Sequence, residues 1–132
     1  MPADEEVARH EDDDVLRFLA TLGGALSAIG ETVDAVETRL VVIARSYGMR
    51  DARFSAFPTF VLLTLGQGKA ATIEPTTRLS ATPRLDQIAA VHRLAEEAER
   101  GAIAPGAGIA RLEEIRATGS RSSSNARRRE IS

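Results

Sequence analysis

Two acidic side chains, Asp34 and Glu37, have a spacing that suits a small ligand site. They stand three residues apart, so a helix places both on one face. Such a carboxylate pair can bind a cation or the amino group of a small ligand. Thr77 and Arg78 end a predicted strand, where exposed polar groups often bind ligands. We therefore expect a ligand site built from these four residues, with a hydrated helix face and an ordinary strand end as the alternatives.

The glycine-rich stretch Gly66-Gln67-Gly68-Lys69 invites comparison with a phosphate-binding loop. That loop needs a glycine five positions before its Gly-Lys pair and a serine or threonine after it. The chain has Leu63 and Ala70 at those two positions. The stretch is therefore predicted to be a hairpin turn, and no cofactor is expected.

Side chains for catalysis and metal binding are sparse. Cysteine is absent, and the two histidines are His10, in an acidic segment, and His92, in a predicted helix. No serine lies in a Gly-x-Ser-x-Gly turn, and no histidine shares metal-ligand spacing with acidic residues. We expect no catalytic residue, no metal site and no enzyme activity, while the role of His92 stays open.

Two amphipathic helices are predicted at about 14–29 and 32–47. Apolar residues recur every three or four positions, which places them on one face of each helix. They are Val15, Leu19, Leu22, Leu26 and Ile29 in the first helix and Val33, Val36, Leu40, Ile43 and Tyr47 in the second. Residues 18–30 are nearly all apolar or small, as in a buried core helix. Gly30 and Gly48 are predicted to end the helices, which should then pack as an antiparallel hairpin.

Residues typical of β-strands dominate the next part of the chain. Residues 53–65 read as short strands interrupted at Pro58, and 71–77 read as their partner. Two closing helices follow, opened by Pro83 and Pro105. Their apolar faces are Leu85, Ile88, Val91 and Ala95, then Ile109, Leu112 and Ile115. The predicted class is α+β: a helical hairpin, a small antiparallel sheet of two to three strands, and two C-terminal helices.

Length and charge bound the organisation of the chain. Its 132 residues, 43% of them hydrophobic, suffice for one domain. A net charge of -2 and only four Phe and one Tyr argue against nucleic-acid binding. Residues 1–14 hold seven acids and one arginine, and residues 118–132 hold four arginines, one glutamate and several serines. We expect both segments to be disordered tails around a folded domain at 15–117.

Short motifs are spread along the whole folded part. They are Leu26-x-x-x-Gly30, Val36-Glu37, Tyr47-Gly48-Met49, Phe57-Pro58-Thr59-Phe60-Val61, Thr77-Arg78-Leu79, Leu85-Asp86 with Arg93-Leu94, Gly101-Ala102-Ile103 and Leu112-x-x-Ile115. In this order and spacing they resemble the N-terminal soluble domain of the threonine/serine exporter family. The resemblance covers about residues 15–117, and it rests on the order of the motifs, since none of them is specific alone.

The resemblance implies a part in exporting small amino acids or related carboxylates across a bacterial inner membrane. In that family this domain precedes a set of membrane helices, whereas this chain turns after Ala117 into a Ser/Arg tail without an apolar run of about 18 residues. We therefore expect a truncated or split exporter domain that works with a membrane-embedded transporter subunit or domain. It would be cytoplasmic and peripheral at the inner membrane through that partner, and a homo-oligomer is left open.

Two other functions remain open at this point. The chain could be a stand-alone small-molecule-binding module whose pocket is lined by the Asp34 and Glu37 face and the strand end. It could also be a hydrolase-like enzyme, although no nucleophile and base can be paired from the sequence.

Overall fold

The structure is a computed structural model of the chain. It describes the backbone of residues 2–56, 60–65, 69–73 and 83–131, and the side chains of residues 13–55, 60–64, 70–73 and 83–118. Its elements are α1 (Pro2–Ala28), α2 (Val33–Ser46), β1 (Arg53–Ala56), β2 (Val61–Leu65), β3 (Lys69–Ile73), α3 (Leu85–Glu99) and α4 (Pro105–Ile131). This order confirms the predicted α+β class. No helix in these described ranges is long and apolar enough to cross a bilayer.

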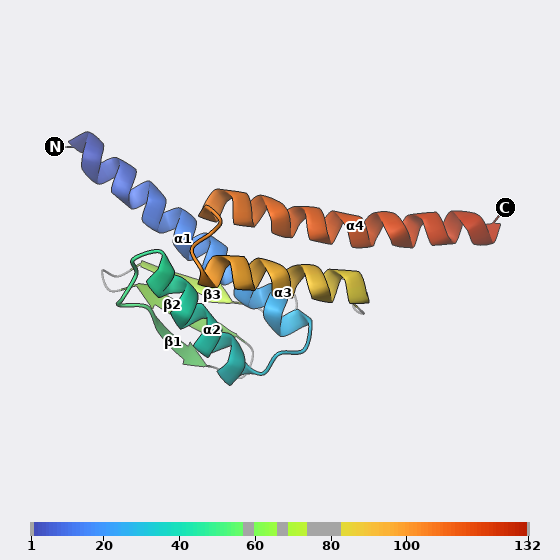
Figure 1. The fold of residues 1–132 in the computed structure, drawn as a ribbon, viewed down its shortest axis with the longest axis horizontal. Coiled ribbons are helices and arrows are strands. Elements are labelled where there is room, and N and C mark those ends of the chain that lie inside the picture. Colours follow the sequence, from blue (N-terminus) through green and yellow to red (C-terminus); the bar gives the residue numbers. More distant parts are fainter. Residues whose placement is uncertain (1, 57–59, 66–68, 74–82, 132) are drawn as a thin grey trace.

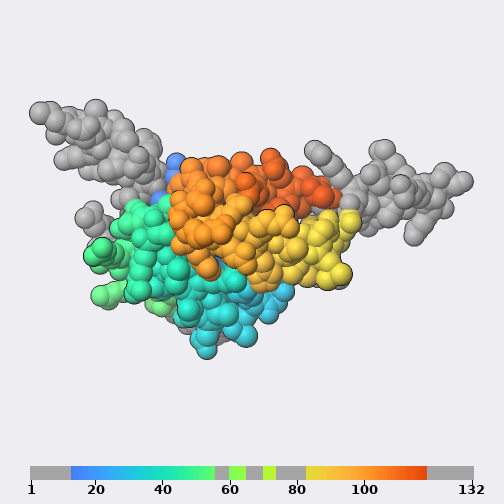
Figure 2. All heavy atoms as spheres, in the orientation of Figure 1, coloured from blue at the N-terminus to red at the C-terminus, as the bar shows by residue number. Residues whose placement is uncertain are grey.

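Helix α1 is the centre of the fold. It contacts all three other helices and strands β2 and β3, and Figure 1 shows it running obliquely between the sheet and α4. Figure 2 shows α2, α3 and α4 covering most of it on the same face. Its fully buried side chains are Phe18, Leu19, Leu22 and Leu26. The prediction of a buried core helix is therefore confirmed.

A glycine follows each helix of the α1–α2 hairpin. Gly30 has φ of 100° and Gly48 has φ of 82°, a left-handed conformation that glycine adopts without a steric penalty. Thr32 then caps α2, because its hydroxyl oxygen accepts a 3.2 Å hydrogen bond from the backbone N–H of Ala35. The predicted hairpin and both glycine stops are confirmed.

The sheet is antiparallel, with strand order β1-β2-β3. In the middle strand Leu63 pairs with Phe54 on one side and Ala71 on the other. Alternation of side chains along each strand sends Val61, Leu63 and Ile73 into the core. The predicted small sheet is confirmed, but its third strand begins at Lys69, inside the predicted turn and two residues before the predicted start at Ala71. Pro58, residues 66–68 of the turn and residues 74–77 of the predicted strand lie outside the described residues.

Helices α3 and α4 are joined by a buried glutamine. Gln87 is 2% exposed, and its amide nitrogen donates to the carbonyl oxygen of Ile115 at 3.2 Å. Its amide oxygen accepts from the backbone N–H of Arg84 at 2.9 Å. Both ends of this polar side chain are thus satisfied, which removes the usual cost of burying it. Pro105 opens α4, as predicted.

Two residues predicted to lie on apolar faces are exposed. Val33 is 45% exposed and Leu85 is 85% exposed. Each is the first residue of its helix, where the helix has not yet reached the elements against which it packs. Periodicity identifies the buried face of a helix, but it does not show where along that face the packing starts.

Helices α1 and α4 extend beyond the predicted folded unit. Their backbone is helical from Pro2 and as far as Ile131, although the sequence suggests disordered tails there. Acidic residues near the start of α1 and arginines near the end of α4 suit the helix dipole. The described core residues run from Val15 to Ile115, and the domain limits at 15 and 117 stay a prediction.

Tyr47 joins the end of α2 to the loop before α4. Its hydroxyl donates a hydrogen bond to the carbonyl oxygen of Ile103. Its ring meets Phe18 edge to face, with 6.2 Å between the ring centroids. Burial raises the pKa of the Tyr47 hydroxyl above its ordinary value, because the charged phenolate is poorly solvated there.

The raised pKa of Tyr47 predicts a loss of stability in alkali. The folded state holds the Tyr47 proton more tightly than the unfolded state does. The stabilisation that results is therefore fully present below the unfolded-state pKa of about 10. The contribution disappears as pH rises through the folded-state pKa. We expect the melting temperature to fall as the pH rises above about 10, and to fall less in the Tyr47→Phe variant. Tyr47 is the single tyrosine of a chain without tryptophan, so tyrosinate absorbance titrates this group alone, and an ordinary midpoint would contradict the prediction.

Candidate functional site

The two predicted ligand carboxylates lie on α2, away from any described cavity wall. Asp34 is exposed in the first turn, and Glu37 is half-buried one turn later. The Asp34 carbonyl oxygen accepts a 2.9 Å hydrogen bond from the hydroxyl of Thr38. Thr77 and Arg78 lie outside the described residues. Their joint site with Asp34 and Glu37 therefore stays a prediction.

A pocket of about 400 Å³ lies between α1, β3 and α4. Five of its lining residues come from one face of α1, spaced as successive helical turns require. Strand β3 contributes one residue and α4 contributes two, one turn apart. The lining residues are Asp13, Leu16, Arg17, Ala20, Thr21, Ala71, Ile109 and Glu113.

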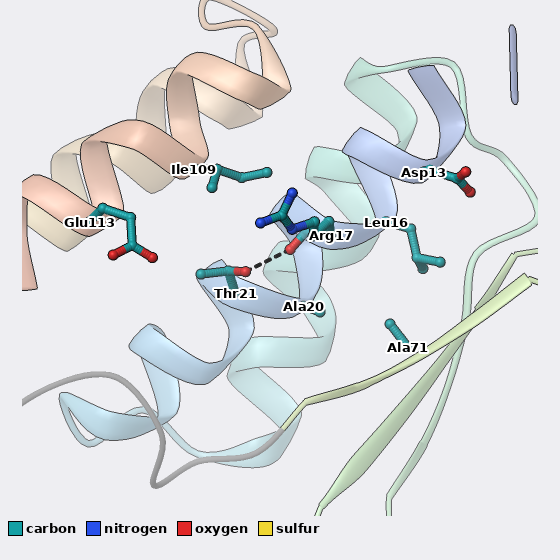
Figure 3. A pocket seen from close by; sticks show the side chains of 8 residues that line it. All are labelled: Asp13, Leu16, Arg17, Ala20, Thr21, Ala71, Ile109 and Glu113. Carbon is teal, nitrogen blue, oxygen red and sulfur yellow. Dashed lines mark hydrogen bonds between the residues drawn. The ribbon is translucent and has the colours of Figure 1, made fainter. Parts of the chain in front are cut away.

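Charges of both signs line this pocket. Figure 3 shows the Arg17 guanidinium in the middle of the view, with the carboxylates of Glu113 and Asp13 on either side. The hydroxyl of Thr21 donates to the carbonyl oxygen of Arg17 at 2.8 Å, which leaves its oxygen able to accept a further hydrogen bond. One oxygen of Glu113 accepts from Arg116 at 2.8 Å. The pocket can thus receive a small molecule that carries both an anionic and a cationic group.

The sequence contains one pattern that belongs to this pocket, a four-residue spacing of lining residues on α1 and on α4. This pattern can be assigned to a pocket only once the fold is known. Arg17 and Thr21 stand four residues apart beside the apolar face of α1, and Ile109 and Glu113 have the same spacing on α4. Each pair by itself is an ordinary surface pattern. Only the packing of α4 on α1 brings them to one cavity.

A second group of charged side chains links the α1–α2 turn to α3. Arg39 Nε lies 3.9 Å from Glu31 Oε1 and 3.6 Å from Glu99 Oε1. His92 Nδ1 is 3.5 Å from the same Glu31 oxygen, a contact that becomes an ion pair when the imidazole is protonated. Glu31 Oε2 and Arg39 Nη1 are buried without a hydrogen-bond partner in the described part of the chain. These charges tether α3 to the hairpin, and His92 finds its partner there.

Replacement of Arg39 by methionine should test this tether. Methionine keeps much of the apolar stem but leaves Glu31 and Glu99 without their shared cation. We expect a loss of about 1–2 kcal/mol in the free energy of unfolding, measured in urea. Arg93→Met, at an exposed position of α3, should change it by less than about 0.5 kcal/mol. Equal losses in the two variants would show that the tether adds nothing.

Comparison with known proteins places these features in a family. The ThrE family model, described as "Putative threonine/serine exporter", matches residues 17–126. The matched region includes the core of the fold from Phe18 onward, the charged tether and all pocket residues except Asp13 and Leu16. No curated protein and no solved structure matches the chain. The family's description is that of an exporter. With most of its length matched, the chain belongs to the threonine/serine exporter family.

Proposed function

We propose that this chain forms the N-terminal domain of a threonine/serine exporter-like transporter. It would contribute to the export of small amino acids or related carboxylates, together with a membrane-embedded partner in the same protein or in a separate chain. The family match over residues 17–126 carries this proposal. That match includes the α1–α2 hairpin from Arg17 onward, the sheet and the closing helices.

The roles of this domain and of its membrane-embedded partner follow from the physics of the bilayer. A path for a polar amino acid through lipid must be built from membrane helices or a closed barrel. The described helices and strands form instead a core packed around α1. We therefore assign the passage to the partner and a recognition or coupling role to this domain, at the cytoplasmic face of the membrane.

Co-purification and export measured together test the proposal. An affinity-tagged chain should be recovered from detergent-solubilised native membranes with a membrane protein of the exporter family. Deletion of its gene should slow the efflux of preloaded threonine and serine, and the full chain should restore it. Unchanged efflux, with the chain absent from the membrane fraction, would overturn the proposal.

A stand-alone small-molecule-binding module is the second candidate. The pocket between α1, β3 and α4, with Arg17 and two carboxylates in its lining, favours it. The two candidates differ in one readout, because a stand-alone module would bind its ligand while its deletion leaves amino acid efflux unchanged.

A further inference from the structure

We propose that an arginine patch at the joined ends of α2 and α3 docks the domain on a membrane surface that carries anionic lipid headgroups. The patch consists of Arg45, Arg50, Arg53 and Arg100. The inference deepens the proposed function and rests on it for the presence of a membrane beside the domain. The patch itself follows from the contacts, exposure and charges of the described residues.

The ends of α2 and α3 are fastened to each other. The hydroxyl of Ser46, the last residue of α2, donates a 2.7 Å hydrogen bond to the carbonyl oxygen of Ala98 in α3. Gly101 follows α3 with φ of 65°, and a Cβ there would lie 3.4 Å from the backbone oxygen of Ser46. Figure 1 shows both helices running toward the same side of the molecule. Arg45 in the last turn of α2 and Arg100 at the C-terminus of α3 are therefore held at one end of the fold.

The other two arginines follow α2 directly. Arg50 lies in the loop after α2, and Arg53 is the first residue of β1. The backbone N–H of Met49 donates to the carbonyl oxygen of Ala44 at 2.8 Å, which holds the start of this loop against the last turn of α2. Four residues span at most about 14 Å, so Arg53 also stays near the helix end. Tertiary contacts and a short loop thus gather the four arginines.

The patch arginines differ in their pairing from most other arginines of the described chain. All four are exposed, and none of them forms an ion pair within the described residues. Four of the remaining six arginines in these residues do pair with a carboxylate, and they are Arg39, Arg84, Arg111 and Arg116. The guanidinium groups of the patch are therefore available to an anion from outside the domain.

Local roles account for only part of the patch. Arg45 and Arg100 lie at helix C-termini, where a positive charge suits the helix dipole. The other two arginines lie outside the helices and have no such role. Two exposed acids stand nearby in the chain, Asp51 in the loop and Glu96 one turn before Arg100, and they leave the four arginines in excess. The patch thus favours an anionic partner.

Anionic lipid headgroups match this patch. A guanidinium can donate two parallel hydrogen bonds to a phosphate, and each basic residue close to an anionic leaflet strengthens binding about fivefold. Cytoplasmic loops of membrane proteins carry an excess of Lys and Arg, so the loops of a membrane partner would repel the patch. The lipid around those loops supplies negative charge instead. The domain would therefore lie with the ends of α2 and α3 toward the bilayer.

Vesicle flotation with the full chain tests the patch. The chain should bind vesicles of phosphatidylglycerol and phosphatidylcholine more tightly than vesicles of phosphatidylcholine alone, and salt should release it because exposed charges are screened. The double variant Arg50→Gln/Arg53→Gln should bind the anionic vesicles about tenfold or more weakly. Arg84→Gln, at the opposite end of α3, should bind as the original chain does. Equal binding to both kinds of vesicle, or by both variants, would overturn the inference.

Removal of an acid from the patch gives a result that misfolding cannot imitate. Asp51→Asn should strengthen binding to anionic vesicles by about twofold to fivefold, and unchanged or weaker binding would contradict lipid contact at this loop. The arginines near the end of α4 stay in every variant, so the differences belong to the patch. Binding to a DNA duplex that the double variant loses, without binding to vesicles, would assign the patch to nucleic acid and overturn lipid docking.

The outcomes separate this inference from the proposed function. Vesicle binding is measured on the chain without a membrane partner, so failure of export or of co-purification leaves its result intact. Successful export and co-purification, with no binding to anionic vesicles, would reject lipid docking and retain the proposed function.

Discussion

Phe18→Ala is expected to lower the free energy of unfolding by about 3–5 kcal/mol. The Phe18 side chain is fully buried in α1, and its ring meets Tyr47 at an interplanar angle of 85°. The same ring lies against the backbone of Gly108 in α4. Truncation therefore leaves a cavity between three elements, α1, α4 and the end of α2, none of which can close it without losing other contacts.

Urea unfolding followed by circular dichroism measures this loss. Phe54→Ala, at a half-buried position of β1, removes the same atoms from the edge of the core. It should cost clearly less, because the removed ring was partly in water already. If the two losses were equal, Phe18 would not hold the three elements together as its burial indicates.

Gly108→Ala is expected to destabilise the protein by about 1–3 kcal/mol. A Cβ at this position would lie 2.4 Å from Phe18 Cε1 and 2.6 Å from Phe18 Cζ, far inside van der Waals contact. The rigid, fully buried ring cannot swing away, so α4 must move off α1. This cost opposes the gain of up to about 1 kcal/mol that alanine brings to a helix interior, and it should exceed that gain.

Gly106 provides the matched control on the same helix. A Cβ there meets nothing within 4 Å, so Gly106→Ala should be neutral or slightly stabilising. The double variant Phe18→Ala/Gly108→Ala should lose less than the sum of the two single losses, because the alanine methyl fills part of the cavity. Additive losses, or a stabilised Gly108→Ala, would show that α4 does not approach α1 through this glycine.

The same seam borders the pocket between α1, β3 and α4. Ile109 and Glu113 follow Gly108 on α4 and line the pocket, while Leu16 and Arg17 precede Phe18 on α1. A shift of α4 at Gly108 would therefore displace one wall of the pocket from the other.

Much of the fold could be read from local patterns. The spacing of Leu19, Leu22 and Leu26 identifies the buried face of α1, and Gly30 and Gly48 mark the ends of α1 and α2. Such signals depend on a few neighbouring residues, so they can be recognised without knowing which elements pack against one another. Val33 and Leu85 show the limit, because their helical periodicity is correct and yet both side chains are exposed.

The candidate site could be predicted less well than the fold from short-range sequence patterns. Asp34 and Glu37 attract attention as a pair at helical spacing, but Asp34 is exposed and neither lines the described pocket. Arg17 and Glu113 show no such pairing in the chain, because 95 positions separate them. Their proximity depends on a contact between the first and last helices, which no short-range pattern records.

By itself, the sequence determined the class of elements, their order and the family resemblance, since each of these depends on residue types and short spacings. Tertiary structure alone decided that α4 docks on α1 through Gly108 and Phe18. It also decided that Arg17, Asp13 and Glu113 surround one cavity and that His92 contacts Glu31. The physical reason is packing: which faces meet is set by the shapes of all the buried side chains together.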